Sequence, residues 1–231
     1  MSKTVLVIAA HPDDEVLGCG GTMAKHAMSG DVVYSVILAE GMTSRDPSRD
    51  RVKHADALTR LGEAARKANE ILGVAALELI DFPDNRMDSV DRLDITKKVE
   101  ACIEKYKPDI VYTHHVGDVN IDHRCIHDAV VTACRPLPGK HVTTVLFFEV
   151  ASSTEWQPPG SAPSFAPNWF VDVSETLETK LKALEAYEIE MREWPHPRSL
   201  RAVSHLAHWR GATIGVEAAE AFVLGRHISK G

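Results

Sequence analysis

A histidine and three consecutive acidic residues follow a short apolar run near the start of the chain, in the sequence AHPDDEVLGCGGT. His11 and Asp14 are three residues apart, and a turn there can bring an imidazole and a carboxylate to one centre as ligands of a zinc-like ion. Asp13 lies between them. A carboxylate that is held beside a metal without binding it can take a proton from water, which is the role of a general base. The motif therefore predicts part of a hydrolytic metal site that still lacks a third ligand.

A second cluster of candidate ligands begins at residue 112, in the segment YTHHVGDVNIDHRCIHDAV. It holds four histidines and three aspartates and is the densest such cluster in the chain. The apolar run DIVYT overlaps its start and is typical of a buried strand. Because ligands of parallel sheets gather beyond the carboxyl ends of the strands, we expect this segment to supply the third ligand.

Strand and helix patterns alternate along the first two thirds of the chain. Apolar and β-branched runs predict strands at 4–10, 32–38, 77–80, 109–113 and 144–150. Between them, apolar residues at helical spacing predict helices over 20–29, 61–72, 95–106 and 123–133. This alternation predicts an α/β fold, a Rossmann-like three-layer sandwich with a mostly parallel central sheet and the active site at the carboxyl ends of the strands.

Beyond residue 150 the regular alternation ends. Residues 151–168 are rich in proline and have no sustained period, so we expect a long surface loop that is a candidate lid over the site. WFVDV at 169–173 predicts a further strand. Ser174 is predicted to cap a helix that carries Leu177, Leu181, Leu184 and Tyr187. We expect residues 1–231 to form a single domain.

Composition restricts the class of partner. The chain has 26 basic and 33 acidic residues and a net charge of −7, which argues against a nucleic acid or an anionic membrane and favours a small molecule. The four cysteines lack paired spacing, as expected for reduced thiols of a cytoplasmic protein. The apolar part of the opening segment is too short for a signal peptide or a membrane span, and no later run approaches the length of a span, so we expect no membrane insertion.

Two segments together resemble a known family. AHPDDEVLGCGGT at 10–22 and DVNIDHR at 118–124 are similar to motifs of the PIG-L/LmbE-like zinc-dependent N-acetylglucosaminyl de-N-acetylases, and RGATIGVEAAEAF looks like endings found in that family. The resemblance implies removal of an N-acetyl group from an amino-sugar-containing small molecule or glycan, with release of acetate. Relatives often assemble as trimers or hexamers, so the resemblance also implies a homo-oligomer.

The resemblance assigns roles by position. It implies His11, Asp14 and His123 as ligands of Zn²⁺ and Asp13 as the general base that acts on zinc-bound water. His127 is the competitor for the third ligand position. Two histidines and one carboxylate also suit Fe²⁺ and other divalent ions, so the ligand types leave the metal open.

One position departs from the family pattern. Many relatives have His-Pro-Asp-His where this chain has Asn-Ile-Asp-His, and the first of those histidines is assigned to oxyanion stabilisation or proton delivery. Asn120 takes that position here, and an amide can donate a hydrogen bond to an oxyanion but cannot supply a proton. Either Asp13 then serves as both base and acid, or another histidine helps, for which His115 is the candidate.

Two further residues have candidate roles around this centre. Asp122, next to His123, is expected to orient an imidazole ring or the base. Arg45, in the loop after the second predicted strand, is a candidate to bind a sugar hydroxyl or a phosphate.

Two other functions fit parts of the sequence. GCGGT after the first strand, with Glu40 about twenty residues further on, is compatible with a Rossmann-type nucleotide-binding protein. However, the pattern is not G-x-G-x-x-G, and three carboxylates stand where a pyrophosphate needs backbone N–H groups. The other alternative is a catalytically inactive relative that binds a metal only for recognition.

Overall fold

A mostly parallel seven-stranded sheet forms the centre of the computed structural model, which describes residues 2–139 and 142–229. In the described residues the strand order is β3-β2-β1-β4-β5-β7-β6. The first five strands pair in parallel, whereas β7 runs antiparallel to both β5 and β6. The strands are β1 (Thr4–Ala9), β2 (Val32–Ala39), β3 (Ala76–Phe82), β4 (Ile110–His114), β5 (Thr144–Phe148), β6 (Trp169–Asp172) and β7 (Ala219–His227).

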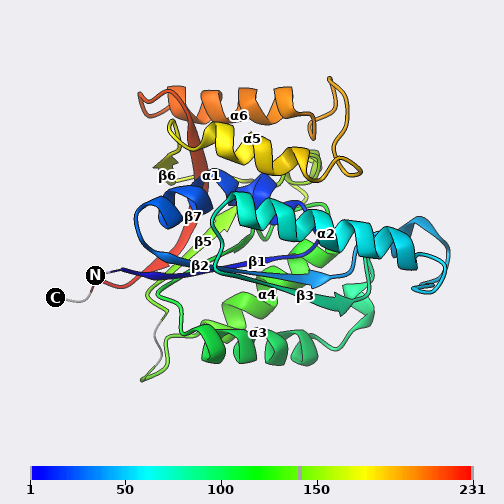
Figure 1. Cartoon of the computed structure of the whole chain (residues 1–231). Coiled ribbons are helices and arrows are strands. Elements are labelled where there is room, and N and C mark those ends of the chain that lie inside the picture. Colours follow the sequence, from blue (N-terminus) through cyan, green and yellow to red (C-terminus); the bar gives the residue numbers. More distant parts are fainter. Residues whose placement is uncertain (1, 140–141, 230–231) are drawn as a thin grey trace.

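Helices cover both faces of the sheet (Figure 1). One face carries α3 (Arg92–Tyr106) and α4 (Ile121–Ala133), and the other carries α1 (Asp14–Met28), α2 (Ala55–Ile71) and α5 (Leu177–Glu185). The last helix, α6 (Leu200–Ala212), packs on α5 as an outer layer. Short 3₁₀ turns lie at η1 (Thr43–Arg45), η2 (Met87–Ser89) and η3 (Thr154–Trp156). The expected α/β fold with a mostly parallel sheet is confirmed.

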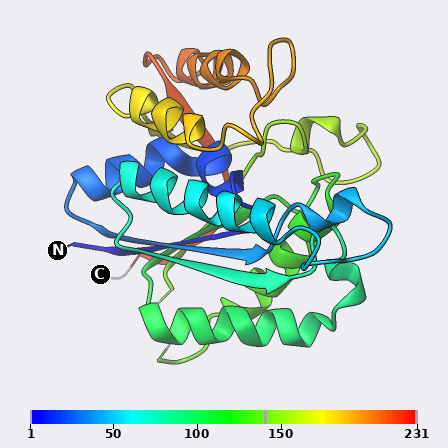
Figure 2. The same cartoon turned by 45° about the vertical axis from the view of Figure 1, so that its right-hand side comes forward.

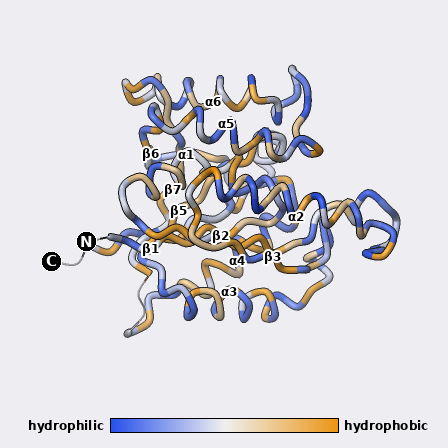
Figure 3. The backbone as a smooth tube through the Cα atoms, in the orientation of Figure 1, coloured by the Kyte–Doolittle hydropathy of each residue, from blue (hydrophilic) through white to orange (hydrophobic). Residues whose placement is uncertain are grey.

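Alternate residues of the central strands build two hydrophobic cores. Val5 and Val7 of β1 pack on the side of α1, α2 and α5, whereas Leu6 and Ile8 pack on the side of α3 and α4. Successive side chains of a strand point to opposite faces, so a strand covered on both faces is apolar at every position. Figure 3 shows this distribution, with hydrophobic segments along the strands and hydrophilic ones on the outer helices. In the described residues no helix is long and apolar enough to cross a membrane.

The carboxyl ends of β1, β2 and β4 point to one end of the molecule, away from the end at which the chain enters β1 (Figure 2). The loops that follow these strands gather there, together with the loop 151–168. This is where a doubly covered parallel sheet leaves a crevice.

Several boundaries differ from the predicted ones. Helix α1 begins at Asp14 rather than near residue 20, because the glycine-rich segment is itself helical, with a break at Cys19. Strand β3 extends to Phe82, beyond the predicted LELI run. Helix α4 begins at Ile121, because Asn120 accepts the capping hydrogen bond from the backbone N–H of Asp122.

The chain beyond residue 168 differs more. The predicted cap at Ser174 is wrong, because Thr176 occupies the N-cap of α5, and the helix ends at Glu185 before Tyr187. Helix α6 and strand β7 had no sequence prediction. Helix α6 carries few buried side chains, Val203 and Ala207 among them, so its apolar period is weak, and β7 is an antiparallel strand outside the alternating pattern.

Candidate functional site

A polar pocket of about 220 Å³ lies at the carboxyl ends of the strands. It is lined by residues from the end of β1, from α1, α2 and the start of α4, from the loops after β2, β3 and β5, and from the segment between α5 and α6. The predicted site residues that line it are His11, Asp13, Asp14, Arg45, Asn120 and His123. The structure therefore brings together two motifs that are more than a hundred residues apart.

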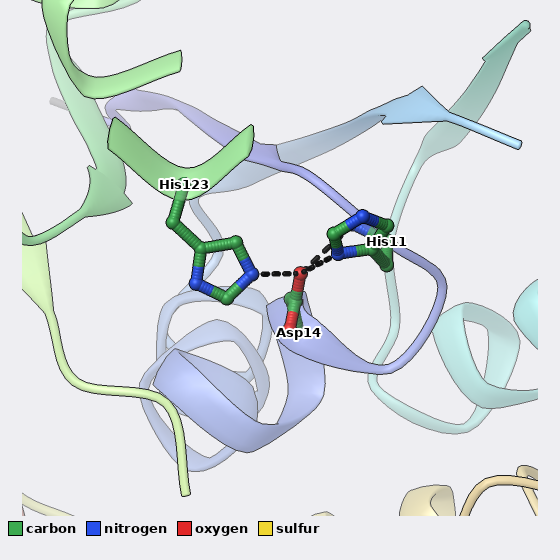
Figure 4. Close-up of side chains that lie close together, drawn as sticks. All are labelled: His11, Asp14 and His123. Atoms are coloured by element: carbon green, nitrogen blue, oxygen red, sulfur yellow. Dashed lines mark hydrogen bonds and ion pairs between the residues drawn. The ribbon is translucent and has the colours of Figure 1, made fainter. Parts of the chain in front are cut away.

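Asp14 lies between two imidazoles (Figure 4). Its Oδ2 atom is 3.2 Å from Nδ1 of His11 and 3.1 Å from Nε2 of His123. One ligand atom from each residue lies within 4.8 Å of the others, as a shared metal ion requires. The buried Nε2 of His123 has no hydrogen bond of normal geometry in the described residues, which leaves it available as a ligand. These residues fit a divalent ion with mixed nitrogen and oxygen ligands.

Each of the two imidazoles has a carboxylate next to its other ring nitrogen, the one that does not face Asp14. Oδ2 of Asp122 lies 3.0 Å from Nε2 of His11 and also accepts the backbone N–H of Asn85, while Oδ1 accepts that of Met87. This geometry places Asp122 beside His11, as a residue that fixes the orientation of the ring. Such carboxylate partners of a ligating histidine set its tautomer and raise its basicity.

Asp118 supports His123 in the same way; it lies in the predicted ligand cluster, but the sequence assigned it no role. Its Oδ2 lies 3.1 Å from Nδ1 of His123, and its carboxylate accepts the hydroxyls of Ser153 and Thr154 from the loop after β5. Burial alone lowers the pKa of His123, but the charges of Asp14 and Asp118 outweigh it and raise that pKa to about 9. The same negative field favours a bound cation.

A second, overlapping group of carboxylates surrounds His11. Oδ1 of Asp84, on the loop after β3, lies 3.4 Å from Nε2 of His11, and His11, Asp84 and Asp122 also meet the distance requirement of a metal site. Asp84 is bound by the backbone N–H of Ser44, which ties the loop after β2 to the pocket.

Asp13 is buried beside the histidine and aspartate cluster without belonging to it. Its φ of 118° is strained for a residue other than glycine, and its N–H donates to Oε2 of Glu15. Glu15 is fixed in turn by the hydroxyl of Tyr187 and the amide of Asn69, and burial raises its pKa to about 7. Burial and the charge of Asp14 raise the pKa of Asp13 well above its usual value, although the nearby Arg198 opposes this.

Arg198 is a second residue that sequence reasoning missed. It lines the pocket, and its Nη1 is 3.2 Å from Oδ2 of Asp13 and 3.6 Å from Oε2 of Glu190. Glu190 also pairs with Arg45 at 2.9 Å. Both Glu190 and Arg198 come from the irregular segment between α5 and α6, which has no periodic pattern that could place it.

Asn120 reaches the pocket with its amide engaged at both ends. Its Oδ1 accepts the N–H of Asp122, and its Nδ2 donates to Oδ1 of Asn85. One hydrogen of Nδ2 remains, so the predicted role as an oxyanion donor is restricted but not removed.

Two histidines do not reach the pocket. Nδ1 of His115 accepts the N–H of Gly117, and its ring lies against Phe165, so the geometry does not support His115 as a donor to the reacting group. His127 turns its Nδ1 to the carbonyl of His114 and its ring to Phe147, which removes it as a competitor for the third ligand position.

The glycine-rich segment offers little to a nucleotide. The N–H groups of Gly21 and Thr22 donate to the carboxylate of Glu220, so they are not available to a phosphate. Glu40, the candidate ribose ligand, is bound by Arg49 through two hydrogen bonds. The site geometry therefore argues against the nucleotide-binding alternative.

Comparisons with known proteins identify the family of the chain. Residues 6–134 match the family model PIG-L, described as GlcNAc-PI de-N-acetylase. The chain is 32% identical over 197 residues to diacetylchitobiose deacetylase of Thermococcus kodakarensis, covering 83% of this chain and 71% of that relative.

Solved structures share the fold at lower identity. An N,N'-diacetylchitobiose deacetylase from Pyrococcus horikoshii matches with a TM-score of 0.77 and 22% identity over 97% of this chain and 84% of that one. The 4-carboxy-2-hydroxymuconate hydratase GalB from Pseudomonas putida matches with the same TM-score and 21% identity over 99% of each chain. Because a hydratase and a deacetylase share the architecture, the fold alone does not fix the reaction. The family model and the relative at 32% identity do settle the family: the chain belongs to the PIG-L family of GlcNAc-PI de-N-acetylases.

Proposed function

We propose that this protein is a metal-dependent N-deacetylase that hydrolyses the acetamide of an amino-sugar-containing small molecule or glycan and releases acetate. The observation that carries the proposal is the placement of Asp13, buried beside but outside the cluster of His11, Asp14 and His123, in one pocket. Membership in the family and the named activity of the relative from Thermococcus kodakarensis support it.

His11, Asp14 and His123 are the residues that would hold the metal, with Zn²⁺ as the first choice and other divalent ions possible for this ligand set. When bound, such an ion lowers the pKa of a coordinated water and polarises a carbonyl group. Asp122 and Asp118 keep the two imidazoles oriented, so the ligand atoms meet without reorganisation.

Asp13 performs the proton transfers in this proposal. Its carboxylate accepts a proton from the attacking water and then delivers it to the nitrogen of the departing amine. The burial of Asp13 beside the metal-ligating cluster keeps its carboxyl group close to both the attacking water and the departing nitrogen. Arg45, which lines the pocket, is the proposed contact to a substrate hydroxyl or phosphate.

The test measures acetate release and metal content on the same three proteins. Wild type, Asp13→Asn and His11→Ala are loaded with zinc, analysed for metal, and assayed on a panel of N-acetyl amino sugars and N-acetylchitooligosaccharides. Asp13→Asn is expected to keep about one zinc per chain and lose about 10²-fold or more in kcat, whereas His11→Ala loses the metal as well. If Asp13→Asn loses zinc and His11→Ala retains it, the assignment of Asp13 as the base and His11 as a metal ligand is wrong.

Absence of acetate release by the zinc-loaded wild type over the whole panel would contradict the deacetylase proposal and favour the inactive relative that only binds metal. Location in the cytoplasm and assembly as a trimer or hexamer remain predictions, which fractionation and light scattering can check.

A further inference from the structure

We propose that Arg198 binds the carbonyl oxygen of the scissile acetamide and stabilises the negative charge that develops on it, in the role that a histidine at position 120 has in many relatives. This inference rests on the proposed deacetylase function. It names a catalytic residue that the two sequence motifs do not contain.

The position of Arg198 supports this role. Its guanidinium lines the same pocket as the metal-ligating cluster and lies 3.2 Å from the carboxylate of Asp13, so it is next to the group that handles the proton. Its side chain is 25% exposed and lines the pocket, so a substrate oxygen can reach the guanidinium. A charged donor forms a stronger hydrogen bond to a developing oxyanion than a neutral amide does.

The backbone fixes Arg198 rather than leaving it on a free loop. Its N–H donates to Nδ1 of His196, and its carbonyl accepts the N–H of Arg192. The next residue, Ser199, is the N-cap of α6 and accepts the N–H of Ala202. A donor held in this way needs little reorganisation when charge develops, which is the condition for effective oxyanion stabilisation.

Other donors around the pocket are less suited. Asn120 has one free hydrogen on Nδ2 after its hydrogen bonds to Asp122 and Asn85, but it carries no charge, and His115 lies outside the pocket. Two arginines line the pocket in the part of the chain that the structure describes, Arg45 and Arg198. Both arginines pair with Glu190, but Arg45 is 48% exposed whereas Arg198 is 25% exposed. Arg198 is the one that contacts Asp13 and so lies beside the proposed base.

In this hydrolysis Arg198 donates a hydrogen bond to the substrate oxygen and keeps its proton throughout. Water forms a bond to the acetamide carbon, the carbonyl electron pair moves to oxygen beside Arg198, and Asp13 takes the proton of the water. The electron pair on that oxygen then re-forms the carbonyl bond as the C–N bond breaks. The C–N pair stays on nitrogen, nitrogen takes the proton from Asp13, and the products are acetic acid and the free amine. Because a guanidinium cannot be deprotonated in proteins, Arg198 leaves both proton transfers to Asp13.

The first experiment compares Arg198→Gln with Arg201→Gln, which removes the same charge from an exposed position at the start of α6, outside the pocket. Arg198→Gln is expected to lower kcat by about 10²–10³-fold, as for loss of one oxyanion donor, with little change in KM or zinc content. Arg201→Gln is expected to leave both kcat and KM within about threefold of wild type. A kcat of Arg198→Gln within threefold of an active wild type would overturn the inference while the deacetylase function stands.

The second experiment separates oxyanion binding from positioning of Asp13. Asn120→His in the Arg198→Gln background restores the imidazole of the relatives and is expected to recover kcat at least tenfold. Calorimetry with methylphosphonate, a tetrahedral anion that mimics hydrated acetate, is expected to show at least tenfold weaker binding to zinc-loaded Arg198→Gln than to wild type. Loss of kcat without rescue and with unchanged methylphosphonate affinity would assign Arg198 to positioning Asp13 and overturn the inference. No acetate release by wild type would overturn the proposed function and this inference together.

Discussion

Lys180 on α5 and Glu220 on β7 form an ion pair of 2.6 Å in the interior, and together they bind the backbone of α1 where that helix is broken. Lys180 donates to the carbonyl of Leu17, and Glu220 accepts the N–H groups of Gly21 and Thr22. The break at Cys19 leaves these groups without helical partners, and the pair satisfies them. The segment that carries Asp13 and Asp14 is thus anchored from outside the helix.

Removing one partner of this pair is expected to destabilise the fold. Lys180→Met leaves the carboxylate of Glu220 buried without its counter-charge, at a cost of about 3–5 kcal/mol in the free energy of unfolding. Lys182→Met, on the exposed side of the same helix, is the control and should stay within about 0.5 kcal/mol of wild type. Urea denaturation measures the free energy of unfolding of both variants. Equal values for Lys180→Met and Lys182→Met would show that the ion pair does not stabilise the broken helix.

Asp118→Asn is expected to weaken zinc binding by about 10–100-fold, because the carboxylate that orients His123 becomes a neutral amide. Asp128→Asn removes a carboxylate that is 42% exposed on α4 and serves as the control. Competition with a chromogenic chelator gives the affinities. An unchanged affinity for Asp118→Asn would mean that His123 is held by packing alone.

Metal removal is expected to lower the thermal stability of the wild type. An ion that binds only the folded state at a concentration 100 times its Kd adds about 2.7 kcal/mol to the free energy of unfolding. Treatment with a chelator should therefore lower Tm for wild type and leave Tm unchanged for the double variant His11→Ala/His123→Ala. A chelator effect on that variant as large as on wild type would place the stabilising metal elsewhere.

The same substitution at two helical glycines is expected to have opposite effects. A Cβ at Gly18 would lie 2.3 Å from the ring of Phe148, so Gly18→Ala overpacks the core at a cost of about 1–3 kcal/mol. A Cβ at Gly62 would meet only the end of Arg66 at 3.3 Å and Leu79 at 3.4 Å, so Gly62→Ala should stabilise α2 by about 0.5–1 kcal/mol. Thermal unfolding compares the two, and stabilisation by Gly18→Ala would contradict the packing of α1 on β5.

Stability is expected to depend on pH through Glu40. Burial by itself raises the pKa of Glu40, but hydrogen bonds from Arg49 and Thr43 outweigh it and hold that pKa below its usual value. The ionised carboxylate therefore stabilises the folded state above the unfolded pKa of about 4.3, and this contribution is lost as the pH falls through the lower folded pKa. The stability difference between wild type and Glu40→Gln should shrink from pH 6 to pH 3.

Glu178→Gln, an exposed position on α5, is the control for this titration. A wild-type advantage over Glu40→Gln that stays constant across the range would show that the charge of Glu40 is not what stabilises the loop after β2.

The sequence by itself determined the parts of the site that are local in the chain. His11, Asp13 and Asp14 leave one strand within a single turn, and the segment with His123 follows another parallel strand, so spacing and sheet geometry predicted that the two segments meet. The resemblance to the family selected His123 within that segment. The alternating pattern likewise predicted the central strands, because their apolar runs can be buried only between two helical layers.

Only the tertiary structure decided which distant side chains complete the pocket. Asp118 was one of several carboxylates in its segment, and Arg198 comes from an irregular stretch whose path is set by packing rather than by a repeating pattern. The structure also places His115, the candidate proton donor, and His127, the competing ligand, outside the pocket and the metal-ligand cluster. A periodic pattern fixes the face on which a residue lies, whereas contact between loops depends on how whole layers pack, which is why these assignments required the folded chain.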